Sequence, residues 1–142
     1  MIKSKKYRIF ILFVFFTFVS CEKMWETWYC IKIENTTTKG IFVSSGCARY
    51  GLFDYPDTTL TVNRPSLLQV NPYDHNDLRS GPKWEYIINE IPSDTLSIYI
   101  FDADTINAYD WSQIKEGYKV LKRYDLSVED LKQKNWTVTY PL

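Results

Sequence analysis

The stretch Thr95-Leu-Ser-Ile-Tyr-Ile-Phe101 is the clearest strand in the sequence and decides the fold class. Successive side chains of a strand point to opposite faces. Three residues here fall on one face and the alternate three on the other: Leu96, Ile98 and Ile100, against Ser97, Tyr99 and Phe101. All five Trp and ten of the eleven Tyr follow residue 20, and such residues favour pleated, half-buried surfaces. The sequence therefore predicts a mainly β protein.

Shorter alternating runs predict further strands on both sides of this one. They cover residues 28–34, 41–45, 60–62, 67–70, 84–88, 118–126 and 136–140. Residues 28–34 and 41–45 flank a polar turn that contains Gly40, which predicts a β-hairpin. Residues 71–82 hold two prolines, a glycine and several Asx residues, so we expect an exposed loop there.

Two capping motifs predict short helices. Asp110 with Gln113 three residues later begins one helix, and Ser127 with Asp130 begins the other. About seven or eight short strands separated by turn signals are typical of a β-sandwich. We therefore expect residues 28–142 to form a single antiparallel β-sandwich domain, immunoglobulin-like or transthyretin-like, with two short helices.

Residues 1–20 predict export from the cytoplasm. Four basic residues and no acid precede an apolar run from Ile9 to Val19 that only Thr17 interrupts. A basic segment, a short apolar segment and a small residue before the cleavage point are the parts of a secretory signal peptide. An uncleaved transmembrane helix is a weaker alternative, because spanning a bilayer takes about 20 apolar residues. A buried core strand is a second alternative, and the five phenylalanines of this run argue against it.

Cys21 directly follows the small residue Ser20, which predicts cleavage by signal peptidase II and lipidation of the Cys21 thiol. The peptidase would recognise Phe18, Val19 and Ser20, with Phe18 in the place where Leu is usual. One acyl chain binds a bilayer only marginally, whereas two or more anchor a protein stably. The three chains usual on a bacterial lipoprotein would therefore fix this protein to its membrane. We expect the outer membrane of the cell envelope and leave open which face.

The chain after the leader is mildly acidic. Removal of the four leader cations leaves 13 Lys and Arg against 17 Asp and Glu, a net charge of −4. Such a chain lacks the basic footprint of a nucleic-acid-binding protein and the polybasic patch that binds anionic lipid. Residues 21–27 form a tether that reaches at most about 20 Å, which predicts a domain close to the bilayer. Trp25 and Trp28 would lie at the membrane interface or pack against the lower end of the domain.

Two segments of the C-terminal half carry a family resemblance: residues 93–102 (SDTLSIYIFD) and 120–141 (VLKRYDLSVEDLKQKNWTVTYP). They resemble a group of small uncharacterised lipoproteins of the Bacteroidetes, which the N-terminal half matches only in layout. The resemblance implies a cell-envelope location and a β-sandwich, and it implies no activity. In that phylum an acidic run after the lipidated cysteine favours export to the surface, and residues 22–26 (EKMWE) are a weak version of it.

Three tripeptides look like the Asp-Ser/Thr-apolar acceptor of protein O-glycosylation in the Bacteroidetes. Their central residues are Thr58, Thr95 and Thr105. Thr105 is the best candidate because it lies on a predicted turn, and Thr95 is the weakest because it starts a strand. Asp-Thr pairs also suit turns, so a purely structural explanation stays open.

Cys30 and Cys47 could form a disulfide in an oxidising envelope. The strand pattern argues against this bond. If Ile31 faces the core, Cys30 points outward, whereas Cys47 keeps the inward parity of Ile41. Only a bulge, which Gly46 could supply, would bring the two thiols to the same face.

No set of residues predicts an enzyme, a metal site or a cofactor. His75 is the sole histidine, and together with Asp74 and Asp77 it makes neither a zinc signature nor a Ser-His-Asp arrangement. Asp102 and Asp104 begin like a calcium-binding EF-hand loop, but the residues that follow do not continue the pattern. Spacing also singles out no carboxylate pair of the kind that a glycosidase needs.

We therefore expect a membrane-anchored interaction module that binds another envelope component, a protein or a glycan, through a loop or a sheet edge. The alternative is a domain that binds glycans or small ligands through exposed Trp or Tyr side chains. A small hydrolase is a third and weaker hypothesis.

Overall fold

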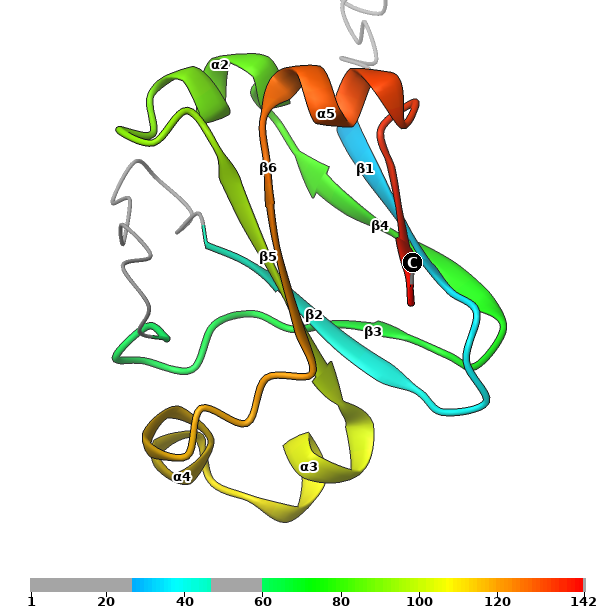
Figure 1. Ribbon diagram of the computed structural model, residues 1–142, viewed down its shortest axis with the longest axis vertical. Helices are drawn as coiled ribbons and strands as arrows, with labels where there is room; N and C mark the ends of the chain where they lie inside the picture. Colours follow the sequence, from blue (N-terminus) through cyan, green and yellow to red (C-terminus); the bar gives the residue numbers. More distant parts are fainter. Residues whose placement is uncertain (1–26, 47–59, 142) are drawn as a thin grey trace, which may run out of the picture.

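The computed structural model of the protein describes residues 27–46 and 60–141. These residues form a mainly β structure of two sheets, with short helices at both ends of the molecule (Figure 1). The elements in chain order are β1 (Tyr29–Asn35), β2 (Ile41–Ser45), β3 (Leu68–Val70), β4 (Asp74–Ser80), α2 (Trp84–Asn89), β5 (Leu96–Asp102), α3 (Ala103–Ala108), α4 (Trp111–Glu116), β6 (Lys122–Leu126), α5 (Val128–Gln133) and β7 (Thr137–Tyr140).

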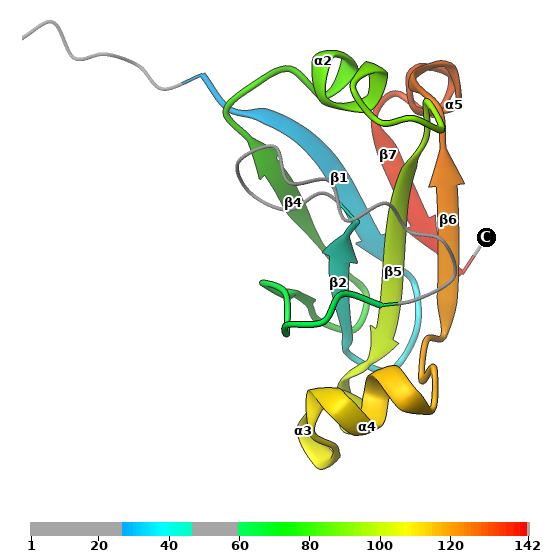
Figure 2. The same ribbon diagram turned by 90° about the vertical axis from the view of Figure 1, so that its left-hand side faces the viewer.

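The strands of the described residues form two open sheets (Figure 2). One sheet has the order β4-β1-β7 and the other the order β3-β2-β5-β6. β1 pairs antiparallel with β4 but parallel with β7. The sequence predicts antiparallel pairing throughout, and this is wrong for β1 and β7. Helix α5 carries the chain across one end of the molecule, so β7 runs beside β1 in the same direction. The described residues also hold four short helices where the sequence predicts two.

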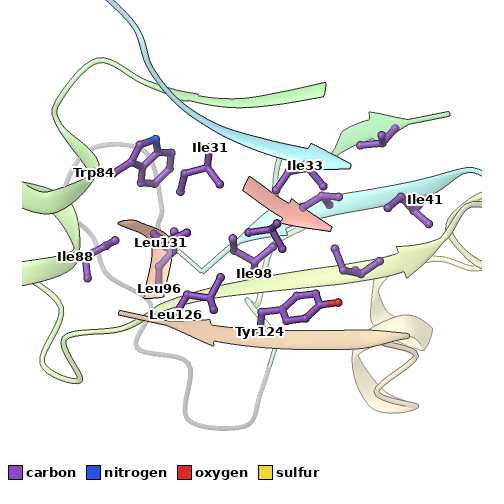
Figure 3. Packing of buried hydrophobic residues seen from close by; sticks show 14 of the residues in the cluster. Ile31, Ile33, Ile41, Trp84, Ile88, Leu96, Ile98, Tyr124, Leu126 and Leu131 are labelled. Atoms are coloured by element: carbon purple, nitrogen blue, oxygen red, sulfur yellow. The ribbon is translucent and has the colours of Figure 1, made fainter. Parts of the chain in front are cut away.

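The main core joins the two sheets (Figure 3). β1 contributes Ile31 and Ile33 from the three-stranded sheet, and both side chains are fully buried. The other buried members come from the four-stranded sheet, β7, and the α2 and α5 region: Ile41, Val43, Val70, Trp84, Ile88, Ile91, Leu96, Ile98, Ile100, Tyr124, Leu126, Leu131 and Val138. Removal of this apolar surface from water is the main driving force for the fold.

The opposite face of the four-stranded sheet carries a second core. Phe101 on β5 packs there with Ile106 of α3 and Ile114 of α4. The indole Nε1 of Trp111 donates a hydrogen bond to the carbonyl oxygen of Thr61 at 2.9 Å, which ties α4 to the segment that precedes β3. β5 is therefore buried on both faces, and the alternation predicted from its sequence is confirmed.

β1 and β2 lie in different sheets, so the predicted hairpin between them is wrong. The buried side chain of Asn35 holds the connection that crosses from one sheet to the other. Its Nδ2 donates to the carbonyl oxygens of Lys39 at 2.7 Å and Asn71 at 3.0 Å. Its Oδ1 accepts from the backbone N–H of Thr37 at 3.0 Å. Both strands turn alternate apolar side chains into one core, and a hairpin would show the same sequence pattern.

The predicted loop at residues 71–82 is wrong for most of its length, because it contains β4. β4 pairs with all seven residues of β1 and forms one edge of its sheet. Its side chains are mostly exposed, and a polar edge strand has the composition of a loop. Tyr73, with a left-handed φ of 53°, makes the turn before it. Residues 60–62, predicted as a short strand, form none.

Two further predicted strands differ from the structure. Residues 84–88 lie in helix α2, where Trp84 and Ile88 stand four residues apart and are buried on the same side. The predicted strand at 118–126 is shortened to β6. The chain turns before β6 because Tyr118 adopts a left-handed φ of 41°.

Side-chain caps begin three of the helices. Asp102 ends β5 and caps α3 by accepting from the backbone N–H of Thr105. Ser127 and Asp130 form a capping box at α5, which confirms the predicted helix. The capping box predicted from Asp110 begins α4, and that helix is also confirmed. Such caps satisfy N–H groups that have no partner inside a helix.

We expect the capping box of α5 to contribute a measurable pH dependence to stability. The Ser127 hydroxyl and then the Ser127 backbone N–H hold the pKa of Asp130 below its usual range. An acid with a lowered folded pKa stabilises the fold above its unfolded pKa, about 3.9, and this stabilisation is lost as the pH falls through the folded pKa. Ser127→Ala should raise the pKa of Asp130, which an NMR titration would measure. It should also reduce the fall in the free energy of unfolding at acid pH, measured by urea unfolding between about pH 2 and 5. An unchanged titration would contradict the role of Ser127.

Candidate functional site

Most of the predicted anchor lies outside the described residues. The predicted site residues outside those ranges are Phe18, Val19, Ser20, Cys21, Cys47 and Thr58. Lipidation, signal-peptide cleavage and a glycan at Thr58 therefore stay predictions. The structure instead describes where the chain enters the domain, because β1 begins eight residues after Cys21.

Cys30 lies near the start of β1, is exposed, and forms no disulfide within residues 27–46 and 60–141. Its neighbour Ile31 is fully buried, so Cys30 points away from the core as the alternation predicts. The predicted partner Cys47 lies outside the described residues, and the disulfide stays a prediction.

The two described threonines of the glycosylation motif both have hydroxyl partners. Thr105 lies in α3 rather than on the predicted turn, and its Oγ1 contacts the capping Asp102 Oδ2 at 3.3 Å. Thr95 precedes β5, and its Oγ1 donates to Ser93 Oγ at 2.9 Å. Both residues are half-buried. A glycan on either hydroxyl would have to displace these hydrogen bonds.

His75, Asp74 and Asp77 all lie on the exposed edge strand β4. His75 Nδ1 is 3.8 Å from Asp74 Oδ1, and both side chains are at least half exposed. The His75 backbone N–H, followed by the Asn71 side chain, lowers the pKa of Asp74. Within the described ranges, no group of three or more His, Cys, Asp or Glu is placed to hold a metal ion.

A cleft of about 180 Å³ lies between β6 and β7, the neighbouring edge strands of the two sheets. Its lining residues are Tyr124, Leu126, Lys134, Thr137, Val138 and Thr139. The Tyr124 hydroxyl spans the gap and donates to the Thr139 carbonyl oxygen at 3.3 Å. The cleft is smaller than the roughly 300–1,000 Å³ usual for small-molecule sites. It therefore has room for no more than about one side chain.

The free edge of β7 faces this cleft. Trp136 and Tyr140 turn their carbonyl oxygens toward β1, where Lys32 N–H and Thr36 N–H donate to them at 2.8 Å. In a parallel ladder the backbone groups of alternate residues point to opposite sides. The backbone N–H and carbonyl of Thr139 therefore point away from β1, as the contact of its carbonyl oxygen with Tyr124 shows. β7 thus offers an uncharged strand edge of four residues.

A polar cluster on β5 and β6 covers part of the second face of the four-stranded sheet. Ser97 Oγ donates to Asp125 Oδ1 at 2.6 Å, and Arg123 Nε donates to the same oxygen at 2.9 Å. The Arg123 guanidinium lies 5.6 Å from the centre of the Tyr99 ring. Burial raises the pKa of Tyr99. The hydrogen bonds among Ser97, Arg123 and Asp125 link the two strands and stabilise the sheet, whereas the buried Tyr99 hydroxyl has no hydrogen-bond partner within the described residues.

Sequence reasoning did not identify the cleft or the polar cluster. Both depend on which strands become neighbours in the fold. The cleft needs β6 beside β7. The cluster needs the register of β5 and β6, which places Ser97 opposite Asp125 and Tyr99 opposite Arg123. The alternation of Arg123 and Asp125 in the sequence was the available signal, but it does not name the partner strand.

Across residues 27–46 and 60–141, no helix is both long enough and apolar enough to cross a membrane. No protein-family model, curated protein or solved structure matches the chain.

Proposed function

We propose that this chain is a lipid-anchored protein of the cell envelope, held at the outer membrane through Cys21. The observation that carries the proposal is the leader, in which a basic segment and a short apolar run end directly at Ser20-Cys21. The entry of the chain into the domain supports it, because β1 begins only eight residues after the cysteine.

The domain of this proposal is a β-sandwich, immunoglobulin-like or transthyretin-like, that acts as an interaction module. The core shared by the two sheets supports the sandwich. The free edge of β7 beside the cleft supports the interaction, because an unpaired strand edge can accept an added strand from another protein. The expected partner is another protein of the envelope.

Cys21→Ala tests the anchor. We expect the variant to lose fatty-acid labelling and to leave the membrane fraction, because the lipid would be attached to Cys21 through its thiol. The measurements are metabolic labelling and membrane fractionation of cells. Cys30→Ser is the matched control, since it removes an exposed thiol of the folded domain and should change neither readout. Retained labelling in Cys21→Ala would overturn the proposal.

Thr139→Pro tests the strand edge. Proline removes the backbone N–H that points into the cleft, so we expect loss of any partner that pairs with β7. Thr139→Ala is the matched control, because it also loses the hydroxyl bond to Glu34 Oε2 but keeps the N–H. The measurement is a crosslinking pull-down of lipidated protein from native envelope, with far-UV circular dichroism to check folding. Equal recovery of partners by the two variants would contradict pairing at β7.

A further inference from the structure

The chain enters the domain at the end that α2 and α5 cover. The indole Nε1 of Trp84, the first residue of α2, donates to the carbonyl oxygen of Tyr29 at 3.0 Å, which fixes the start of β1 against this helix. Helix α5 contacts α2, and Figures 1 and 2 both show the two helices together at one end of the molecule. The helices α3 and α4 lie at the opposite end in both views.

A lipid on Cys21 would keep this end of the domain nearer to the bilayer than the other. Residue 27 is six residues beyond Cys21, and an extended chain of that length spans at most about 20 Å. β5 runs from the α2 end to α3, and its seven residues alone extend over roughly 23 Å. The anchor therefore cannot place the α3 and α4 end at the membrane without turning the α2 and α5 end toward it as well.

Two exposed aromatic side chains stand at the anchored end. Trp28, directly before β1, is 48% exposed, and Tyr86 in α2 is 64% exposed. Tyr86 lies between the buried residues Trp84 and Ile88, so it projects from the side of α2 that faces away from the core. Trp and Tyr are the side chains that favour the lipid headgroup region, because one part of each is apolar and the other forms hydrogen bonds.

Charge does not explain a membrane contact at this end. Lys83 precedes α2, but Glu85 lies in its first turn and Glu90 follows its last residue. In α5, Glu129 and Asp130 are matched by Lys132 and Lys134, so the two helices together carry no excess of positive charge that would draw this end to anionic lipid. An attachment at this end has to come from the acyl chains and from the exposed aromatic rings.

We propose that the α2 and α5 end is the membrane-facing surface of the domain, with Trp28 and Tyr86 in the headgroup region of the bilayer that holds the Cys21 lipid. This inference rests on the proposed lipidation and adds an orientation to it. The lining of the β6–β7 cleft reaches Leu126 and Lys134 on either side of α5, so the cleft begins beside this membrane-facing end.

The experiment compares one probe at each end of the full, lipidated protein in vesicles of phosphatidylethanolamine and phosphatidylglycerol. In a Cys30→Ser, Cys47→Ser background, an environment-sensitive fluorophore is attached to Tyr86→Cys or, separately, to Tyr109→Cys. Tyr109 is the matched site, because it is also an exposed tyrosine but lies at the α3 and α4 end. Quenching by phospholipids that carry a spin label in the headgroup or just below it reports contact with the bilayer.

We expect several-fold stronger quenching and a blue-shifted emission at position 86 compared with position 109. Trp28→Ser should weaken the quenching at position 86, whereas Tyr118→Ser at the far end should not. Equal quenching at both positions, or stronger quenching at 109, while the protein still floats with the vesicles, would overturn the orientation and leave the anchor intact. Failure to float with the vesicles would overturn the proposed function and the orientation together.

Discussion

Phe101→Ala is expected to lower the free energy of unfolding by about 3–5 kcal/mol, the range for removing a buried phenylalanine from a core. Phe101 is completely buried in the second core. Its ring meets Trp111 edge to face, with the ring centres 5.8 Å apart, and lies 6.5 Å from the ring of Tyr99. Alanine would therefore leave a cavity where β5 meets α3 and α4.

Urea unfolding followed by circular dichroism would measure this loss. Leu121→Ala is the matched control, because Leu121 is 48% exposed and its truncation should change the free energy of unfolding by no more than about 0.5 kcal/mol. A double-mutant cycle with Trp111→Ala should give a coupling of roughly 0.5–1.5 kcal/mol for the ring pair. A loss below about 1 kcal/mol for Phe101→Ala would show that the second core is not tightly packed.

The parts of the fold that could be predicted are those that local rules determine. β5 was predictable because it is long enough for its period of two to appear in Leu96, Ile98 and Ile100. The helices α4 and α5 were predictable because Asp110 and Ser127 carry capping boxes, which are formed by residues three apart in the chain.

The parts that could not be predicted depend on contacts between distant residues. β4 is polar because it lies at a sheet edge, and only its pairing with β1 distinguishes it from a loop. The short run at 84–88 fits a strand or a helix equally well, and the packing of Trp84 and Ile88 against the core selects the helix. The alternation in β1 and β2 gives the face of each strand but does not show that they enter different sheets.

The candidate site also has a part that the sequence alone predicts and a part that depends on contacts between distant residues. The leader and Cys21 form a linear signal, so the sequence alone supports the proposed anchor. The cleft needs Tyr124 of β6 beside Thr139 of β7. These two strands belong to different sheets, and α5 lies between them in the sequence. The membrane-facing end likewise needs the position of Tyr86 on a helix that the sequence predicts as a strand.

Asn35→Ala is expected to lower the free energy of unfolding by about 2–4 kcal/mol, because it removes a buried side chain and leaves several partly buried backbone groups without partners. The side chain is only 1% exposed and links β1 to two other segments. Its Nδ2 donates to the carbonyl oxygens of Lys39 and Asn71, and its Oδ1 accepts from the backbone N–H and the hydroxyl of Thr37. Asn107→Ala, an exposed position in α3, is the matched control and should change the stability by no more than about 0.5 kcal/mol.

Asn35→Asp distinguishes the hydrogen bonds that the Asn35 side chain donates from those that it accepts. The aspartate keeps an acceptor for the Thr37 N–H but cannot donate to the carbonyl oxygens of Lys39 and Asn71 when it is ionised. We therefore expect both variants to be destabilised in urea, while amide exchange at Thr37 stays slow in Asn35→Asp and becomes fast in Asn35→Ala. If Asn35→Asp were as stable as the parent protein, the two donated bonds would not be what holds the crossing between the sheets, and its direction would have to come from the core residues on either side, Ile33 and Ile41.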